Sequence, residues 1–217
     1  MHRLAEHFDP RFAAAIYVGA GCGLRWGEMA GLELEHIDFR LGRREVTVRQ
    51  QVVPKRGIGH VLGPPKTGAS YRTVEMPTAT VFALSRHIEL YPPKLINVWD
   101  ASEGGERPAR IVFPSSTGRP LSSRSWGFMW NKAAKAAGLP TGAGAYHLLR
   151  HYFATSLIFG GANVKVVQLA LGHATPMITL NTYLGYWPED QSDRTRHLID
   201  AALGNEPYLV PGAAGEV

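Results

Sequence analysis

Apolar residues recur along the first part of the chain at spacings that predict helices. Residues 12–24 are apolar and rich in alanine, which predicts a buried helix that ends in a cluster of glycines. A second short helix is expected to start near Trp26. Val81, Leu84 and Ile88 fall at helical spacing and predict another helix.

Two apolar stripes predict further helices in the second half of the chain. One stripe runs along residues 126–137. The other comprises Val164, Val167 and Leu171, and it follows Asn163, a residue type that is favoured at helix N-caps. The second half of the chain is therefore expected to be helical.

Alternating β-branched and polar residues predict strands between these helices. Residues 45–53 (EVTVRQQVV) have this pattern, and residues 60–63 and 71–76 are two further strand candidates. The prolines and glycine within 64–68 are typical of a turn. We therefore expect a small antiparallel sheet with Lys66 at the tip of a hairpin.

The combined pattern predicts a mainly α fold with a small antiparallel β-sheet, in the α+β class. A chain of 217 residues, 45% of them hydrophobic, is long enough for one sizeable core. We expect one domain over residues 1–204 and a flexible tail over 205–217. Residues 91–108 contain proline and glycine without periodicity and are expected to form a surface loop.

Composition narrows the class of protein. No apolar run approaches the roughly 20 residues of a membrane span. The first ten residues carry charges and histidine where a signal peptide would be apolar, so we expect a cytosolic protein. Cys22 is the single cysteine, which excludes an internal disulfide and a cysteine-based zinc site and suits a reducing compartment.

The distribution of charge indicates a polyanionic partner. The net charge is +5 and the pI is about 9.5. No Asp or Glu occurs from Pro114 to Pro188, and Glu45 is the only acid between Arg40 and Arg72. Acid-poor stretches of this length are typical of a face that approaches phosphates. The basic residues expected to contact a nucleic-acid backbone are Arg43, Arg44, Lys55, Arg72, Arg124 and Lys132.

Four short islands carry residue types suited to catalysis. They are 23–28 (GLRWGE), 65–68 (PKTG), 147–150 (HLLR) and 171–173 (LGH), the last followed ten residues later by Tyr183. Each island alone is a weak signal. The glycines near position 21 do not indicate a dinucleotide-binding loop, because they follow a helical pattern where that loop follows a strand.

Taken together and in this order, the islands resemble the catalytic set of tyrosine recombinases and phage integrases. The resemblance spans about residues 12–187, and residues 146–155 (YHLLRHYFAT) match the family's His-x-x-Arg box with its following aromatic and Ala-Thr. It implies the fold of the family's catalytic domain. It also implies the catalytic residues Arg25, Lys66, His147, Arg150, His173 and Tyr183, with Glu28 as a supporting carboxylate.

The resemblance implies a site-specific recombinase that cleaves and rejoins double-stranded DNA through a 3′-phosphotyrosine, with no ATP, metal or other cofactor. Arg25 and Arg150 would clamp the non-bridging phosphate oxygens, because planar guanidinium groups meet such oxygens with paired hydrogen bonds. The family's general acid matches Lys66. His147 or His173 would accept or share the proton of the attacking tyrosine.

Two alternatives remain open. A type IB topoisomerase shares the phosphotyrosine and the arginine clamp, and an inactive DNA-binding relative would keep only the affinity for DNA. Tyr186 competes with Tyr183 as the nucleophile, although it lies outside the family's Thr-Tyr context. Leu184 and Gly185 follow Tyr183 where many relatives carry a histidine two residues later. Trp187 is expected either in the shell around the site or in the ordinary core.

The resemblance also implies partners and a location. We expect double-stranded DNA as the substrate, a homotetramer on DNA, a monomer without it, and no membrane. An amphipathic trace over residues 194–203 would dock on a neighbouring copy. The family's N-terminal core-binding domain is expected to be absent, which predicts weak and salt-dependent DNA binding. The expected location is the cytoplasm of a bacterial host cell, on phage or chromosomal DNA.

Overall fold

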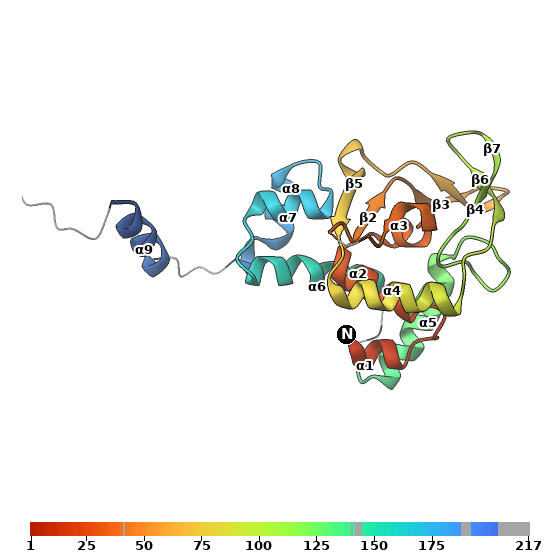
Figure 1. Ribbon diagram of the computed structural model, residues 1–217, viewed down its shortest axis with the longest axis horizontal. Helices are drawn as coiled ribbons and strands as arrows, with labels where there is room; N and C mark the ends of the chain where they lie inside the picture. The colour runs from red at the N-terminus through yellow and green to blue at the C-terminus, as the bar shows by residue number, and fades with distance from the viewer. Residues whose placement is uncertain (41, 140, 142–144, 188–191, 204–217) are drawn as a thin grey trace, which may run out of the picture.

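The computed structural model describes residues 1–40, 42–139, 141, 145–187 and 192–203 (Figure 1). Helix α2 (Ala13–Cys22) lies at the centre of the core, and it packs against α4 (Thr78–Leu90) and α6 (Ala145–Phe159). The predicted helix over 12–24 is thereby confirmed. It ends where Gly23 adopts a left-handed φ of 60°, which glycine adopts without steric cost because it has no Cβ.

The other predicted helices are also present. They are α3 (Trp26–Ala30), α4, α5 (Ser123–Ala136) and α7 (Val164–Leu171). The side chain of Asn163 accepts a hydrogen bond from the Val166 N–H at 3.0 Å, which makes it the N-cap of α7. Helix α8 (Pro176–Tyr183) begins with a proline, whose fixed φ suits the first turn. Helix α1 (His2–Glu6) was not predicted, since a single turn carries no periodicity.

The strands form two small sheets where the sequence predicted one. The first sheet is antiparallel, in the order β1-β2-β5. The second has the order β3-β4-β6-β7, with β4 and β6 paired in parallel. The bounds are β1 (Ile37–Asp38), β2 (Glu45–Val48), β3 (Gln51–Lys55), β4 (Gly59–Gly63), β5 (Arg72–Glu75), β6 (Ile96–Asp100) and β7 (Gly105–Ala109). The α+β class is confirmed, whereas the single antiparallel sheet is wrong.

The hairpin prediction for Lys66 was also wrong. Strand β3 pairs with β4, and Lys55 is opposite Gly59, so the hairpin turn lies over 56–58. Lys66 instead lies in the connection that leaves β4 in one sheet, passes the short 3₁₀ helix η2 (Gly68–Ser70) and enters β5 in the other. The sequence predicted strand positions correctly there but could not show that 45–53 divides between two sheets.

The predicted surface loop over 91–108 contains the hairpin β6–β7, which corrects that prediction. Arg107 holds it in place: its Nε donates to the Asp100 carboxylate at 2.8 Å, and its Nη2 donates to the Glu33 carboxylate at 2.7 Å. Strand β7 contains Pro108 and no β-branched residue, so strand propensity gives no signal for it. Ion pairs and pairing to β6 decided its conformation.

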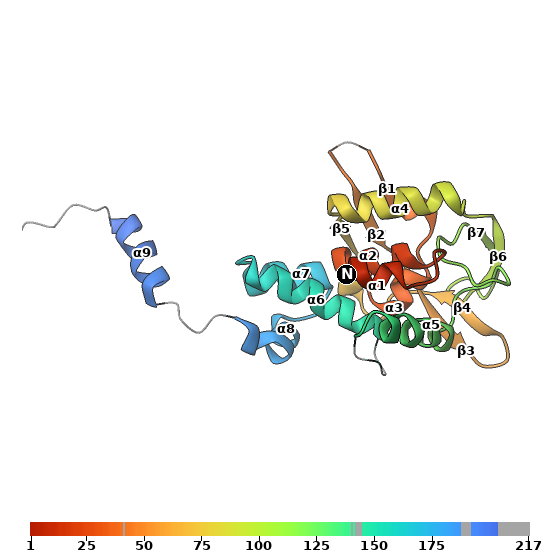
Figure 2. The same cartoon turned by 90° about the horizontal axis from the view of Figure 1, so that it is seen from below.

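Two apolar clusters divide the molecule, and α6 belongs to both. Tyr146 and Leu149 in its first half lie in the main core. Ala154 and Ile158 in its second half pack with residues of α7 and α8 in a smaller cluster. In both views α6, α7 and α8 extend from the body that holds the sheets, and α9 (Ser192–Leu203) lies apart (Figures 1 and 2). His147 and Arg150 lie in α6, the helix that joins the two clusters.

Over the described residues, the helices are too short or too polar to cross a bilayer. The predicted tail over 205–217 lies outside the described residues.

Candidate active site

Arg25 stands at the N-cap of α3 and is fixed there by Glu28. One oxygen of the Glu28 carboxylate accepts a hydrogen bond from the Arg25 N–H at 2.9 Å. The other accepts from Arg25 Nη1 at 2.7 Å. The Glu28 carboxylate is buried at the side-chain level, whereas 26% of the Arg25 side chain remains exposed. Glu28 therefore fixes the orientation of the Arg25 guanidinium, while part of the side chain remains accessible to solvent.

Glu28 has a second partner, Arg72 of β5. Arg72 Nη2 and Nη1 donate to the two oxygens of the Glu28 carboxylate at 2.9 and 3.2 Å. Burial alone would raise the pKa of Glu28, but the charges and hydrogen bonds of Arg72 and Arg25 outweigh burial and lower it. Glu28 is therefore a carboxylate at neutral pH.

Arg72 does not have the surface position expected of a DNA contact. Its side chain is only 6% exposed. The acid-poor stretch around Arg72 indicated a solvent-facing cation. Charge patterning compares only neighbours in the sequence, so it could not show that Arg72 pairs with the buried Glu28, 44 residues away. This corrects the expectation for Arg72.

Three arginines converge on the C-terminal end of α7, which we call the α7 carbonyl end and define as the carbonyl groups of residues 170–172. Each carbonyl accepts one hydrogen bond from a different arginine. The pairs are Arg72 Nε with Ala170 O at 2.9 Å, Arg150 Nη2 with Leu171 O at 2.6 Å and Arg25 Nη2 with Gly172 O at 3.3 Å. Unpaired carbonyls and the helix dipole make such an end attractive to cations.

Arg150 is the most buried of the catalytic candidates with a charge, with 2% of its surface exposed. Its Nη1 donates to the Gly23 carbonyl at 2.5 Å, so it joins the end of α2 to the end of α7. Burial first, and then the charges of Arg25 and Arg72, lower the pKa of Arg150 to about 9. Arg150 therefore remains a cation at neutral pH.

The two histidines lie within the field of these arginines. Burial, followed by the charges of Arg150 and Arg25, lowers the pKa of His173 to about 4. Burial and the charge of His151 lower the pKa of His147. His173 Nδ1 lies 2.9 Å from Thr179 Oγ1. Both rings are therefore neutral at pH 7 and have a nitrogen that can accept a proton.

The backbone conformation and the close neighbours of residue 172 require a glycine between Leu171 and His173. It caps α7 in the left-handed region, with a φ of 62°. A Cβ at this position would lie 2.9 Å from the Ala69 carbonyl oxygen and 3.0 Å from the Arg72 side chain. A larger residue would push apart the α7 carbonyl end and the arginine that it holds.

Tyr183 ends α8 and is 1% exposed. It packs in the smaller apolar cluster, and its ring lies edge-on to His151 with 5.3 Å between the ring centroids. Burial raises the pKa of Tyr183, and the nearby charge of Arg150 opposes that shift. Tyr186 lies in the 3₁₀ helix η3 (Leu184–Tyr186) and is 48% exposed.

Lys66 is exposed, but the segment that carries it is tied to Arg25. The hydroxyls of Thr67 and Ser70 lie 3.0 Å apart, and Ser70 Oγ accepts a hydrogen bond from Arg25 Nη1 at 3.2 Å. Sequence reasoning missed Ser70 and Thr179, both fully buried. In the sequence, the only indication of a role for these two hydroxyl residues is that each lies close to a predicted motif.

Trp187 packs against the smaller cluster, and its Nε1 donates to the Ala162 carbonyl at 3.3 Å. That position agrees with the shell around the site, one of the two alternatives given by the sequence.

The remaining basic residues expected at DNA do not form one patch. Arg43 and Arg44 lie in the β1–β2 turn, and Lys55 lies at the end of β3 beside the β3–β4 turn. These two turns project on opposite sides of the body (Figure 2). Lys55 Nζ lies 4.8 Å from the centre of the Trp99 ring. Arg124 and Lys132 are exposed on α5.

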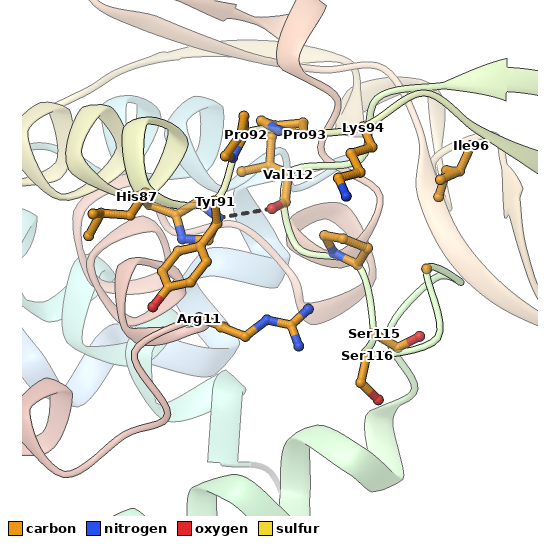
Figure 3. A pocket seen from close by; sticks show the side chains of 13 residues that line it. Arg11, His87, Tyr91, Pro92, Pro93, Lys94, Ile96, Val112, Ser115 and Ser116 are labelled. Carbon is orange, nitrogen blue, oxygen red and sulfur yellow. Dashed lines mark hydrogen bonds between the residues drawn. The ribbon is translucent and has the colours of Figure 1, made fainter.

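A cavity of about 420 Å³ lies away from these residues, at the C-terminal end of α4. Arg11, His87, Tyr91 and Lys94 contribute to its lining (Figure 3). His87 Nε2 donates to the Val112 carbonyl at 3.0 Å, and burial lowers the pKa of His87. None of the catalytic candidates lines this cavity. Within the described residues, no group of three or more His, Cys, Asp or Glu side chains is placed to hold a metal ion.

Known proteins are similar to this chain in sequence and in fold. Residues 1–186 match the model of the phage integrase family. The chain is 31% identical over 191 residues to the prophage integrase IntR of Escherichia coli K12, which covers 83% of this chain and 44% of that protein. It is 33% identical over 157 residues to the tyrosine recombinase XerD of Mycobacterium tuberculosis, covering 72% of this chain and 42% of that protein.

Solved structures agree with this match. The integrase of the transposon Tn1549, in complex with transposon right end DNA, is 25% identical with a TM-score of 0.71, covering 89% of this chain and 59% of that one. The catalytic domain of bacteriophage HP1 integrase has a TM-score of 0.54 at 19% identity, covering 94% and 90%. The chain spans about half the length of the curated relatives it matches. Sequence and fold together place this chain in the phage integrase family, with the fold of tyrosine recombinase catalytic domains.

Proposed function

We propose that this chain is the catalytic part of a site-specific recombinase that cleaves and rejoins double-stranded DNA through Tyr183. The observation that carries the proposal is the convergence of Arg25 and Arg150 on adjacent carbonyls of the α7 carbonyl end. Neutral His147 and His173 lie in their field. The relatives named as tyrosine recombinases, and the neighbour bound to transposon DNA, support this chemistry.

The arginine pair supplies the electrostatic part of the mechanism. Attack on a phosphodiester builds negative charge on the non-bridging oxygens, and guanidinium groups held in advance stabilise that charge without rearranging. Arg25 has an exposed part that can face the phosphate. Arg150 is hydrogen-bonded to two carbonyls and buried, so it contributes its positive charge to the site without facing solvent. Loss of one such donor costs on the order of a hundredfold in rate.

The proton steps involve three side chains. Tyr183 Oη forms a bond to phosphorus while the bond from phosphorus to the 5′ oxygen breaks, which leaves the protein on the 3′ phosphate. Because burial raises the pKa of Tyr183, it is protonated at neutral pH and its proton must pass to a base such as His147 or His173. Lys66 donates a proton to the leaving 5′ oxygen. The phosphotyrosine keeps the bond energy, so rejoining reverses these steps without ATP.

Tyr183 must also move before it can attack. Its side chain is buried in the smaller apolar cluster and has almost no contact with solvent. We infer that binding of DNA draws α8 and the tyrosine out of this cluster.

We further propose that the chain acts as a tetramer on DNA in the cytoplasm of a bacterial host. Helix α9 lies apart from the body and exposes Ile199 and Leu203, 53% and 79% respectively (Figure 1). Apolar residues exposed on an amphipathic helix favour docking on another copy.

A covalent-trapping experiment tests the recombinase proposal. The protein is incubated with a pool of duplexes of randomised sequence in which a sulfur atom replaces the bridging 5′ oxygen, so that each cleavage accumulates as an adduct. Wild type is expected to form an SDS-resistant adduct, and Tyr183→Phe is expected to form none. Sequencing of the trapped DNA identifies the preferred site. Accumulation compensates for weak binding, because the trapped complex does not dissociate.

The alternatives predict different outcomes. An adduct that persists in Tyr183→Phe and disappears in Tyr186→Phe would assign the nucleophile to Tyr186. Adducts without sequence preference, together with relaxation of supercoiled plasmid, would favour the topoisomerase. Binding of the pool by wild type without any adduct would favour the inactive relative.

A further inference from the structure

We propose that Arg72 is a positioning residue for the phosphate clamp, by which we mean the partly exposed Arg25 together with the positive field of the buried Arg150. Arg72 holds both arginines in place without touching DNA. The proposal rests on the recombinase function proposed above. It replaces the surface role that the charge pattern assigned to Arg72.

The first support is the contact between Arg72 and the same helix end that holds the two clamp arginines. Arg72 Nε donates to the Ala170 carbonyl, the first of the three carbonyls in the α7 carbonyl end. Arg72 comes from β5, whereas Arg25 comes from the start of α3. Arg72 therefore fixes the position of the α7 end relative to the sheet. In doing so it also fixes the carbonyls that orient Arg25 and Arg150.

The second support is the shared carboxylate of Glu28. Arg72 occupies both of its oxygens, and Arg25 Nη1 shares one of them. Without Arg72, Arg25 would be the principal partner of a buried carboxylate and would be drawn toward it. Because a fully paired guanidinium has less charge to offer a phosphate, the clamp would weaken. With Arg72 present, two guanidinium groups share one carboxylate, Arg150 adds a third positive charge nearby, and the cluster stays positive.

The third support is the difference in exposure. The Arg72 side chain is 6% exposed, compared with 26% for Arg25, although both bind the same carboxylate. Arg72 Nη1 also donates to the Ser70 carbonyl at 3.1 Å. All three of its nitrogens are therefore directed at protein groups, and a DNA phosphate would have to displace one of them.

The experiment compares Arg72→Met, Glu28→Gln and the double variant on the trapped DNA. It measures the rate constant of adduct formation at saturating DNA, and the Kd for the same DNA in a Tyr183→Phe background at several salt concentrations. Arg72→Met is expected to lower the rate constant by about a hundredfold and to change Kd less than about twofold. The double variant is expected to regain at least about tenfold over Arg72→Met, because no unbalanced carboxylate remains.

Two outcomes would overturn the proposal. A weaker Kd with a salt slope smaller by about one, at an unchanged rate constant, would make Arg72 a phosphate contact. A double variant no faster than Arg72→Met would show that Glu28 is not the route by which Arg72 acts.

If circular dichroism shows that Arg72→Met does not fold, Arg72→Lys replaces it in the test. One ammonium group cannot bind both Glu28 oxygens and the Ala170 carbonyl, so a rate loss of about tenfold at unchanged Kd is expected. A wild-type rate in Arg72→Lys would contradict the proposal.

Orthovanadate, which imitates five-coordinate phosphorus, gives a readout that does not require strand cleavage. Wild type is expected to bind it, and Arg72→Met is expected to bind it at least about tenfold more weakly. Equal binding by both proteins would contradict the positioning role. An absence of adduct in wild type, with this difference in vanadate binding retained, would refute the recombinase function alone.

Discussion

At the scale of single residues, hydrogen bonds to backbone carbonyls orient the guanidinium groups of the site. Arg150 donates to the carbonyls of Gly23 and Leu171, which lie far apart in the chain. A carboxylate in the same place would neutralise the guanidinium, whereas a carbonyl orients it and leaves its charge available. The sequence identified Arg25 and Arg150 through their motifs, but it could not show which groups orient them.

Lys66 is the residue whose proposed role is easiest to separate from simple phosphate binding. Lys66→Ala should slow cleavage of an ordinary phosphodiester by about a hundredfold, because the 5′ alkoxide leaves poorly without a proton. The same change should have little effect when sulfur is the leaving atom, because a thiolate leaves without protonation. Single-turnover rates of adduct formation on the two substrates measure the difference.

Lys55→Ala is the matched control for Lys66→Ala, since Lys55 lies in the hairpin β3–β4 of the same region. It should affect both substrates equally. An equal loss on both substrates in Lys66→Ala would instead indicate that Lys66 only contacts phosphate.

At the scale of elements, the end of α7 and the start of α3 form the site because turns of fixed geometry bring them together. Gly23 and Gly172 both adopt left-handed conformations at helix ends, with φ of 60° and 62°. Each directs its chain toward the arginine cluster. The glycines in the GLRWGE and LGH islands are therefore part of the geometry of the site, and not only spacers.

Gly172→Ala should lower the free energy of unfolding by more than the roughly 1–2 kcal/mol expected for a left-handed alanine. The added Cβ would also press against the Ala69 carbonyl and Arg72. Gly161→Ala is the matched control, because Gly161 has a φ of 85° with open space around it. Urea denaturation measures both, and equal losses would show that the close packing around Gly172 has no energetic effect.

At the scale of the whole molecule, the lowered pKa values of several histidines, most of them only partly buried, make stability depend on pH. His36, His87, His147, His151 and His173 all have lowered pKa values, with burial as the first cause of each. The unfolded chain binds protons at these rings near pH 6.5, whereas the native protein does not until lower pH. Native stability is therefore highest above pH 6.5 and falls as the pH falls.

For His173 the window runs from its ordinary pKa of 6.5 down to its native pKa of about 4. The melting temperature of wild type should decrease steadily across this window. His173→Gln should decrease less steeply, because it removes the group with the pKa lowered to about 4. Parallel melting curves for the two proteins at each pH would contradict this assignment.

The sequence alone predicted the helical regions after α1 and the α+β class, and it named the catalytic candidates. Helical periodicity and the order of short motifs are local properties, and they stand in the chain whatever it packs against. The resemblance to the family likewise named Glu28 as a supporting carboxylate, and in the structure Glu28 accepts a hydrogen bond from Arg25.

Only the tertiary structure decided the pairing of strands, the position of Lys66 and the burial of Arg72. Each depends on contacts between distant segments: β2 pairs with β5, β4 pairs with β6, and Arg72 reaches Glu28 and Ala170. Burial of Tyr183 is of the same kind, because α6, α7 and α8 must pack together to cover it. Local patterns fix what each segment can become, and long-range packing decides which charge is buried and which faces a substrate.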